Sequence, residues 1–211
     1  MPPTFPFPRI VVLSGNPRPA SRTRTVARTV AERIARECVA GRGGHAVVPR
    51  PAAAGVENAA GFENIDLALI AQYLFADTNG LVAAALASIR AADVLVVATP
   101  VYKGSYTGLL KAFLDLLPAG GLTGVIAVPV IVAGAPAHQA VAELHLRPLL
   151  AELGATVPTS AFSIVEAQLP ALDTQVDDWA AANGRLVQAA AALVIEARVS
   201  EAAVSEAELA R

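Results

Sequence analysis

The chain alternates short apolar runs with longer stretches of helical periodicity. Residues 94–98, Val-Leu-Val-Val-Ala, form an unbroken apolar run, which is typical of a strand buried on both faces of a sheet. Residues 21–40 instead repeat an apolar side chain every fourth position and predict a helix with one buried face, formed by Val26, Val30, Ile34 and Cys38. The alternation predicts an α/β fold in which a doubly wound, five-stranded parallel sheet carries helices on both faces.

The expected elements follow one another along a single domain. Strands are expected at residues 10–13, 46–48, 94–98, 125–132 and 156–164, and helices at 21–40, 79–92, 108–117, 137–153 and 176–203. Residues 51–64 are rich in alanine, glycine and proline and predict a loop, while residues 65–75 fit neither periodicity. The domain is expected at 9–195, after a loose proline-rich leader at 1–8 and before a helical or frayed tail at 196–211.

Composition argues against several classes of function. Sixteen lysines and arginines against eighteen aspartates and glutamates give a formal net charge of -2, so we expect no nucleic-acid partner. No apolar run approaches the ~20 residues of a spanning helix, and we expect a cytoplasmic protein that does not bind membranes. The single cysteine, Cys38, excludes an intrachain disulfide. His138 and His145 come without a carboxylate cluster, so we expect no metal site.

In a doubly wound sheet, ligands bind beyond the carboxyl ends of the strands, which directs attention to three loops. The first, residues 14–23, joins a strand to a helix whose N-terminal N–H groups attract a phosphate. Its hydroxyl groups and charges come from Arg18, Ser21, Arg22 and Thr23. It is neither a Walker A loop nor a G-x-G-x-x-G dinucleotide loop, so it suits a terminal monophosphate. On residue types alone, the alternative is that Ser21 caps the helix while the arginines face solvent.

The other two loops offer aromatic and small residues. Residues 99–108 contain Tyr102, Lys103 and Tyr106, a set that suits a flat aromatic ligand carrying negative charge. The alternative for this loop is a packed turn that supports the next helix. In residues 133–138, small side chains let backbone amides approach a ligand closely. The sequence has no acid–base constellation and no G-x-S-x-G nucleophile elbow, which favours chemistry by a bound cofactor.

Three segments then carry a resemblance in matching order. The first is Ser-Gly-Asn-Pro-Arg at 14–18 with Ser21 and Thr23, the second covers residues 99–118, and the third joins 134–138 to Leu-Arg-Pro-Leu-Leu at 146–150. Through them the chain, from about residue 9 to 164, resembles the NAD(P)H-dependent FMN reductases of the flavodoxin-like superfamily. It is most similar to the branch that serves alkanesulfonate-type two-component monooxygenases. The resemblance implies a flavodoxin-like fold with strand order 2-1-3-4-5.

The resemblance also implies an FMN site formed by all three loops. The phosphate would be held by Asn16, Arg18, Ser21, Arg22 and Thr23. The ribityl chain and ring would be lined by Pro100, Val101, Tyr102, Lys103, Ser105 and Tyr106, and the polar edge of the ring by Gly134 and Ala135. In the family, NADPH or NADH gives a hydride to N5 of the flavin, so no side chain is expected to act as a catalytic acid or base. Lys103 is expected to stabilise the charge of reduced flavin.

Partners and open questions follow from the same resemblance. Family members form homodimers or homotetramers in which a second subunit helps to build the flavin site, and a flavin-dependent monooxygenase is the expected recipient of reduced FMN. The family's third loop often has two adjacent glycines, and Ala135 stands at the second of these positions. Some members of the branch carry an aromatic residue linked to flavin release where this chain has Leu144. Two alternatives stay open: a reductase that retains FMN and reduces quinones or azo dyes, and an electron carrier without nicotinamide activity. The choice between NADH and NADPH also stays open.

Overall fold

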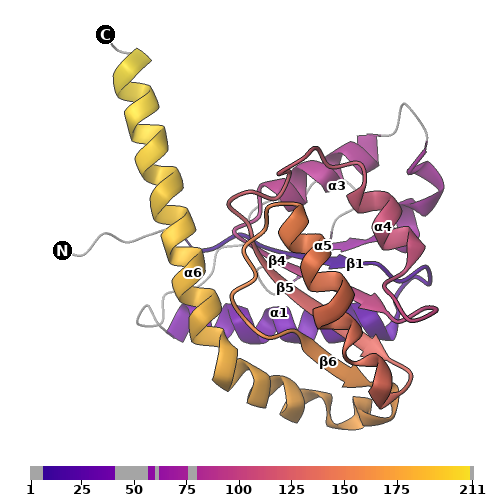
Figure 1. Cartoon of the computed structure of the whole chain (residues 1–211). Coiled ribbons are helices and arrows are strands. Elements are labelled where there is room, and N and C mark those ends of the chain that lie inside the picture. Colours follow the sequence, from indigo (N-terminus) through magenta and orange to yellow (C-terminus); the bar gives the residue numbers. More distant parts are fainter. Residues whose placement is uncertain (1–6, 41–56, 60–61, 76–79, 210–211) are drawn as a thin grey trace.

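The computed structural model describes residues 7–40, 57–59, 62–75 and 80–209. Its centre is a six-stranded sheet in the order β2-β3-β1-β4-β5-β6, covered by helices on both faces (Figure 1). The strands are β1 (Ile10–Ser14), β2 (Glu57–Ala59), β3 (Phe62–Asp66), β4 (Val94–Pro100), β5 (Ile126–Ala133) and β6 (Phe162–Val165). Neighbouring strands run parallel, except that β2 pairs antiparallel with β3 at the edge.

The parallel strands confirm the predicted fold class and strand order. In chain order they are β1, β3, β4, β5 and β6, and their positions in the sheet give the order 2-1-3-4-5. The predicted loop at 51–64 is wrong for residues 57–59 and 62–64, which form β2 and the start of β3. The strand expected at 46–48 lies outside the described residues. Strand β3 lacked an apolar signal because its sequence is Phe-Glu-Asn-Ile-Asp, and its Glu63 is buried against Arg9, with Nη2 and Oε2 2.9 Å apart.

Helices pack on both faces of the sheet because side chains alternate along each strand. On one face, Ile10 and Val12 of β1 belong to a core that includes α1 (Arg22–Ala40) and α6 (Leu172–Leu209). On the other face, Val11 and Leu13 pack with α3 (Gly80–Arg90), α4 (Gly108–Leu114) and α5 (Arg147–Glu152). A short helix, α2 (Leu67–Ile70), follows β3 directly. The run at 94–98 is buried on both faces, as its unbroken apolar sequence predicts.

The helix expected at 137–153 is irregular. It begins as the 3₁₀ turn η2 (Pro136–His138), continues through the π-helical turn η3 (Ala142–Leu146), and becomes α-helical only in α5. Pro148 has no N–H to donate, and its ring would clash with the carbonyl of Leu144 in a regular α-helix, which explains the wider turn. The strand expected at 156–164 is also shorter. Only β6 and one bridge between Ile126 and Thr156 form, since Pro158 cannot donate to a ladder.

Helix α6 begins earlier and ends later than the 176–203 expected, so the predicted tail is helical through Leu209. Arg198 fixes α6 to the body, because its Nη1 donates to Asp93 Oδ1 at 2.7 Å and its Nη2 to Gly124 O at 2.8 Å. Beyond this contact the last turns stand clear of the sheet and its other helices (Figure 1). Among the described residues, none of the helices combines the length and the apolar character needed to span a membrane.

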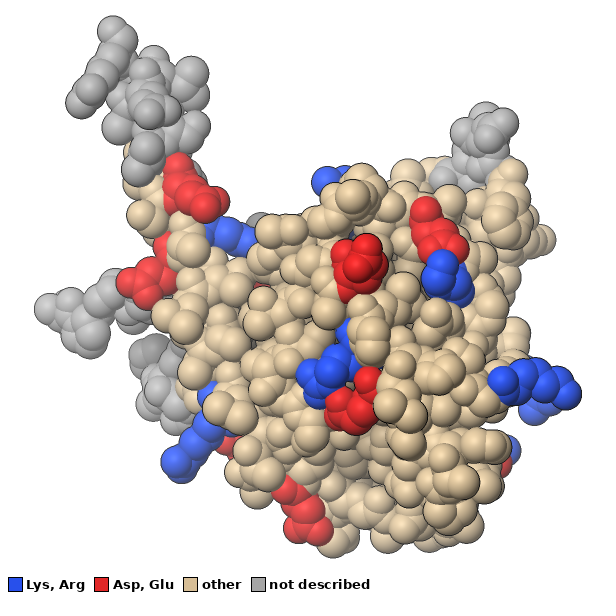
Figure 2. All heavy atoms as spheres, in the orientation of Figure 1, with Lys and Arg blue, Asp and Glu red and all other residues tan. Residues whose placement is uncertain are grey.

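Charged side chains are sparse on the face drawn in Figure 2, where basic and acidic residues lie in small mixed groups. Two ion pairs of the described residues join positions one helical turn apart, Lys111 with Asp115 and Arg147 with Glu143. Exposed pairs of this kind contribute little to stability. On this face, the charge distribution offers neither a basic nor an acidic surface of any extent.

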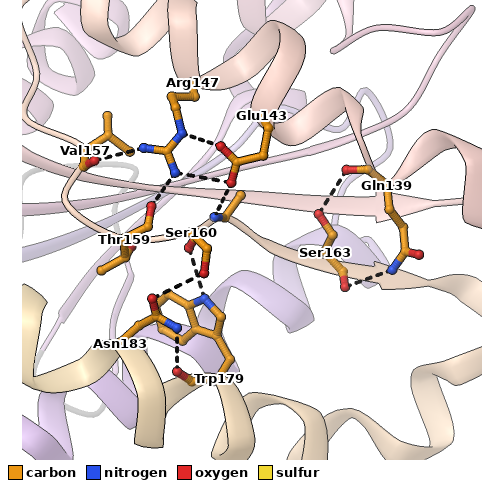
Figure 3. A network of polar contacts seen from close by, with 10 residues as sticks. Gln139, Glu143, Arg147, Val157, Thr159, Ser160, Ser163, Trp179 and Asn183 are labelled. Atoms are coloured by element: carbon orange, nitrogen blue, oxygen red, sulfur yellow. Dashed lines mark hydrogen bonds and ion pairs between the residues drawn. The ribbon is translucent and has the colours of Figure 1, made fainter.

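The second of these pairs belongs to a larger network (Figure 3). Arg147 binds Glu143 across η3, and it also donates to Val157 O at 2.8 Å and to Thr159 O. Glu143 Oε1 in turn accepts from Ala161 N at 2.8 Å. The π-helical turn is thereby fixed to the segment that leads into β6.

Gln139 and Trp179 extend this attachment on either side. Gln139 Nε2 donates to Ser163 O at 3.2 Å, and Ser163 Oγ donates to Gln139 O at 3.2 Å. Trp179 of α6 donates through Nε1 to Ser160 O at 3.1 Å. The irregular helix after β5 is therefore held through Gln139, Glu143 and Arg147, and the segment that Glu143 and Arg147 contact is joined to α6 by Trp179 (Figure 3).

The network predicts a pH-dependent contribution from Glu143. Its pKa is lowered, chiefly by the hydrogen bond from Arg147, against an opposing effect of burial. A lowered folded-state pKa stabilises the fold at neutral pH, and this stabilisation is lost as the pH falls through that pKa. Because the Glu143 side chain is 45% exposed, we expect Glu143→Gln to cost at most about 1 kcal/mol. Urea unfolding at pH 7 and pH 3 measures the loss of unfolding free energy, which should be smaller at pH 3. A cost equal to that of Glu152→Gln, on exposed α5 surface, would contradict the assignment.

Candidate functional site

The carboxyl ends of β1, β4 and β5 lie side by side. Strand β4 pairs with both neighbours, so that Ser14 lies opposite Ala98 and Ala98 opposite Val130. The loops after these strands therefore meet at one edge of the sheet. They are the same three loops that the sequence singled out.

The first loop is held by its own side chains. Asn16 Nδ2 donates to Thr23 Oγ1 at 3.0 Å, and Arg18 N donates to Asn16 Oδ1 at 2.9 Å. Asn16 and Thr23 are both buried, so they brace the loop from inside. Ser21 Oγ accepts from Arg24 N at 3.3 Å and thus caps α1. The cap satisfies one N–H group of the first turn, and the remaining ones point out of the helix end.

The two arginines expected at the phosphate lie on the surface of this loop. Arg18 is exposed, and Arg22 Nη1 lies 3.4 Å from Glu166 Oε2 of the 3₁₀ turn η4 (Glu166–Ala171). The Arg22 and Glu166 side chains are 63% and 45% exposed. An ion pair in that environment is weak. Arg22 can therefore exchange its carboxylate partner for a phosphate at little cost.

A residue outside the three loops supports the first one. Asp66, the last residue of β3, accepts from Ala20 N through Oδ2 at 3.1 Å and from Ala68 N through Oδ1 at 3.3 Å. Arg24 Nη1 lies 3.9 Å from the same carboxylate. Ala20 has a φ of 50°, a backbone conformation that favours glycine. The sequence carried no signal for this contact because Asp66 is 46 residues away from Ala20.

Thr107 joins the first loop to the second. Its hydroxyl donates to Gly15 O at 2.5 Å and accepts from Leu110 N at 3.1 Å, which makes Thr107 the N-cap of α4. Its N–H donates to Thr99 Oγ1 at 3.1 Å. The approach is close enough to require Gly15, since an added Cβ would lie 2.7 Å from Leu110 Cβ. The two loops are thus fixed relative to each other by buried contacts.

The second loop forms a tight turn. Tyr102 N donates to Ser105 O at 2.9 Å, and Ser105 N donates to Tyr102 O at 3.1 Å. Lys103 and Gly104 have φ values of 52° and 76°, as a type I′ turn requires of its two central residues. Positive φ is unfavourable for lysine, so the turn stores strain at Lys103. The side chains of Tyr102 and Lys103 are exposed at its tip.

The other residues expected in this loop lie beneath the turn. Pro100 ends β4 and is buried, while Val101 and Tyr106 are half-buried against the core on the α4 side. The Ser105 side chain makes a hydrogen bond outside the loop, described next. The loop therefore has an exposed tip and a packed base, and the base supports the next helix as one of the two interpretations of the sequence expects.

The third loop is open and joins the second through the helix that follows it. Gly134 is exposed, and a Cβ added there would meet no atom within 4 Å, while Ala135 is half-buried. His145 of η3 places Nδ1 3.0 Å from Ser105 Oγ. Leu144, beside it, is 69% exposed. The third loop thus leaves room for a ligand edge, and its helix contacts the turn at 102–105.

These residues fit FMN. The first turn of α1 presents N–H donors at the positive end of the helix dipole, with Ser21 and Arg22 beside it, as a phosphate requires. At the same edge of the sheet, the turn presents an exposed tyrosine and lysine, which suit a planar ring that gains negative charge. Room at Gly134 admits the ring's polar edge. The sequence missed two supporting residues, Asp66 and Thr107, which act on the loops through long-range contacts.

Comparison with known proteins identifies the family. Residues 8–169 match the family model for NADPH-dependent FMN reductase. Over 67 residues the chain is 45% identical to the FMN reductase (NADPH) of Escherichia coli K12, a match that covers 32% of this chain and 35% of the relative. It is 41% identical over 83 residues to the NADH-dependent FMN reductase SfnF of Pseudomonas putida, covering 39% and 45%. These matches span less than half the length of either relative.

A solved structure extends the likeness over most of the fold. The apo form of the NADH:FMN oxidoreductase EMOB superposes with a TM-score of 0.64 at 28% identity, covering 90% of this chain and 89% of that one. The family model covers the strands β1 to β6 and all three loops described above. The chain is therefore a member of the NADPH-dependent FMN reductase family.

Proposed function

We propose that this protein is an NAD(P)H-dependent FMN reductase whose flavin occupies the three loops after β1, β4 and β5. The observation that carries the proposal is the convergence of a helix N-terminus, a strained turn with exposed Tyr102 and Lys103, and an open loop at Gly134 on one edge of the sheet. FMN, when bound, supplies the acceptor for a hydride from NADPH or NADH. The protein supplies binding, orientation and charge stabilisation.

Each loop has a separate role in this proposal. The first-turn N–H groups of α1 and the side chains of Arg18, Ser21 and Arg22 bind the phosphate, while Asn16 and Thr23 keep the loop in shape. Tyr102 packs on the ribityl chain or ring, and the base of its loop keeps water from the buried side. The amides around Gly134 and Ala135 bind the polar edge of the ring. No side chain needs to transfer a proton.

A double substitution tests the phosphate assignment. Ser21→Ala with Thr23→Ala removes the cap and the internal brace, and we expect FMN affinity to fall several-fold, at about 0.5–1.5 kcal/mol for each lost hydrogen bond. Flavin fluorescence quenching measures the dissociation constant. Thr29→Ala, on the same helix and half-buried, is the matched control and should leave it unchanged. An unchanged affinity in the double variant would remove the phosphate from this loop.

Lys103 offers a test in which stability and activity move in opposite directions. Lys103→Gly relieves the positive φ of 52°, and we expect a gain of about 0.5–1 kcal/mol in unfolding free energy. The same change removes the cation proposed to stabilise reduced flavin, so the rate of FMN reduction should fall. Thermal unfolding and NADPH oxidation measure the two effects. Equal rates in the two proteins would show that the turn alone, and not its charge, is required.

We further propose that FMN is a substrate which leaves in reduced form for a partner monooxygenase. Support comes from the resemblance of residues 99–118 and 146–150 to the two-component branch and from the similarity to the NADH-dependent FMN reductase SfnF. Anaerobic mixing of excess FMN and NADPH with a trace of the protein tests it. Bleaching of many flavin equivalents per subunit is the expected result. Bleaching that stops near one equivalent would replace this role with that of an FMN-retaining reductase.

One observation favours that second candidate. Leu144, exposed in η3, stands where some members of the two-component branch carry an aromatic residue linked to flavin release. A chain that retains FMN would pass electrons to quinones or azo dyes. The electron-carrier alternative has less support, since the net charge is only -2 and Figure 2 has acidic residues scattered over the face drawn. FMN retained without any oxidation of NADPH or NADH would favour that carrier.

We also propose a homodimer or homotetramer in which a second subunit covers the turn and η3. The exposed side chains there include Tyr102 at 43% and Leu144 at 69%, which are large and apolar in their greater part. The Ser105–His145 contact brings these two segments together on one surface. A subunit seated on this surface would shield the flavin ring from water.

A further inference from the structure

We propose that Asp66 is a positioning residue for the phosphate loop, because it holds Ala20 in the left-handed conformation from which α1 begins. The inference rests on the function proposed above and adds a residue that lies in none of the three loops. Asp66 does not touch the phosphate in this account. It acts through the backbone of Ala20.

The contacts of Asp66 are buried and directional. Its Oδ2 accepts from Ala20 N at 3.1 Å, and its Oδ1 accepts from Ala68 N at 3.3 Å as the N-cap of α2. Its side chain is 3% exposed, and its backbone is paired with Ser14 in the parallel ladder. The carboxylate is therefore attached both to the sheet and to α2. Its position relative to the start of the first loop is fixed.

The position of the Asp66 carboxylate affects the first loop through Ala20. Its φ of 50° is a left-handed backbone conformation that is unfavourable for a residue with a Cβ. The two following residues are Ser21, which caps α1, and Arg22, which begins it. The backbone direction at Ala20 therefore sets where the free N–H groups of the first turn point. The hydrogen bond to Asp66 offsets the cost of that direction.

The charge of Asp66 would by itself repel a phosphate. Arg24 compensates the negative charge of Asp66, since its Nη1 lies 3.9 Å from Asp66 Oδ2 and its side chain is 16% exposed. A carboxylate and a guanidinium at this distance leave little net charge beside the loop. The role that remains for Asp66 is geometric, and it should affect only ligands that carry the phosphate.

This distinction defines the experiment. Dissociation constants for FMN and for riboflavin, which lacks the phosphate, are measured by fluorescence quenching on the full chain and on Asp66→Ala. We expect FMN affinity to fall about tenfold, the effect of one lost hydrogen bond to a charged group, while riboflavin affinity changes less than about twofold. Ala20→Gly in the Asp66→Ala background should restore most of the FMN affinity, because glycine adopts positive φ without support.

A second variant covers the case in which Asp66→Ala fails to fold. Ala20→Val keeps Asp66 and its contacts with Ala68, but a β-branched residue resists positive φ, so it should weaken FMN binding and spare riboflavin. Equal losses for FMN and riboflavin, or no restoration by Ala20→Gly, would overturn the inference while leaving the reductase function intact. A wild-type chain that binds neither flavin would overturn both.

Discussion

Parallel pairing of β4 with β1 on one side and β5 on the other is the constraint on which the site depends. It brings the ends of three strands that are far apart in the chain to one edge of the sheet. The buried hydroxyl of Thr107 then links the first two loops through Gly15, and the pair Ser105 and His145 links the second to the helix after the third. The flavin site proposed here is a consequence of that register, and each loop adds only local chemistry to it.

The apolar strands could be predicted, whereas β3 could not. Strands β1, β4 and β5 are buried on both faces, and their sequences are apolar except for Ser14 and Thr99. Strand β3 lies in the same sheet but contains Glu63, Asn64 and Asp66. Its buried polar groups bind distant residues, as Glu63 binds Arg9. Hydrophobic periodicity predicts a loop for such a segment, because it carries no information about the distant residues that pair with the polar side chains. The π-helical turn is similar, since its cause, Pro148, was visible but its geometry was not.

The candidate site was predicted to the extent that its chemistry is local. The loops that follow strands, the cap at Ser21 and the aromatic and cationic residues of the second loop are all features of short segments. What supports them is not local. Asp66 meets Ala20, and Thr107 meets Gly15 at a separation of 92 residues, and only the fold brings these pairs together. The positive φ values of Ala20 and Lys103 could not be predicted either, because a glycine indicates such a conformation in a sequence, whereas an alanine or a lysine does not.

The central claim is that one flavin binds across all three loops, and hydrogen–deuterium exchange of the full chain with and without saturating FMN tests it most directly. The account predicts slower exchange in peptides that cover residues 15–23, 99–107 and 133–138, together with little change in α3 and in the last turns of α6. Protection of the first loop alone would mean that the chain binds only a phosphate. Protection away from the carboxyl edge of the sheet, with the three loops unchanged, would contradict the account.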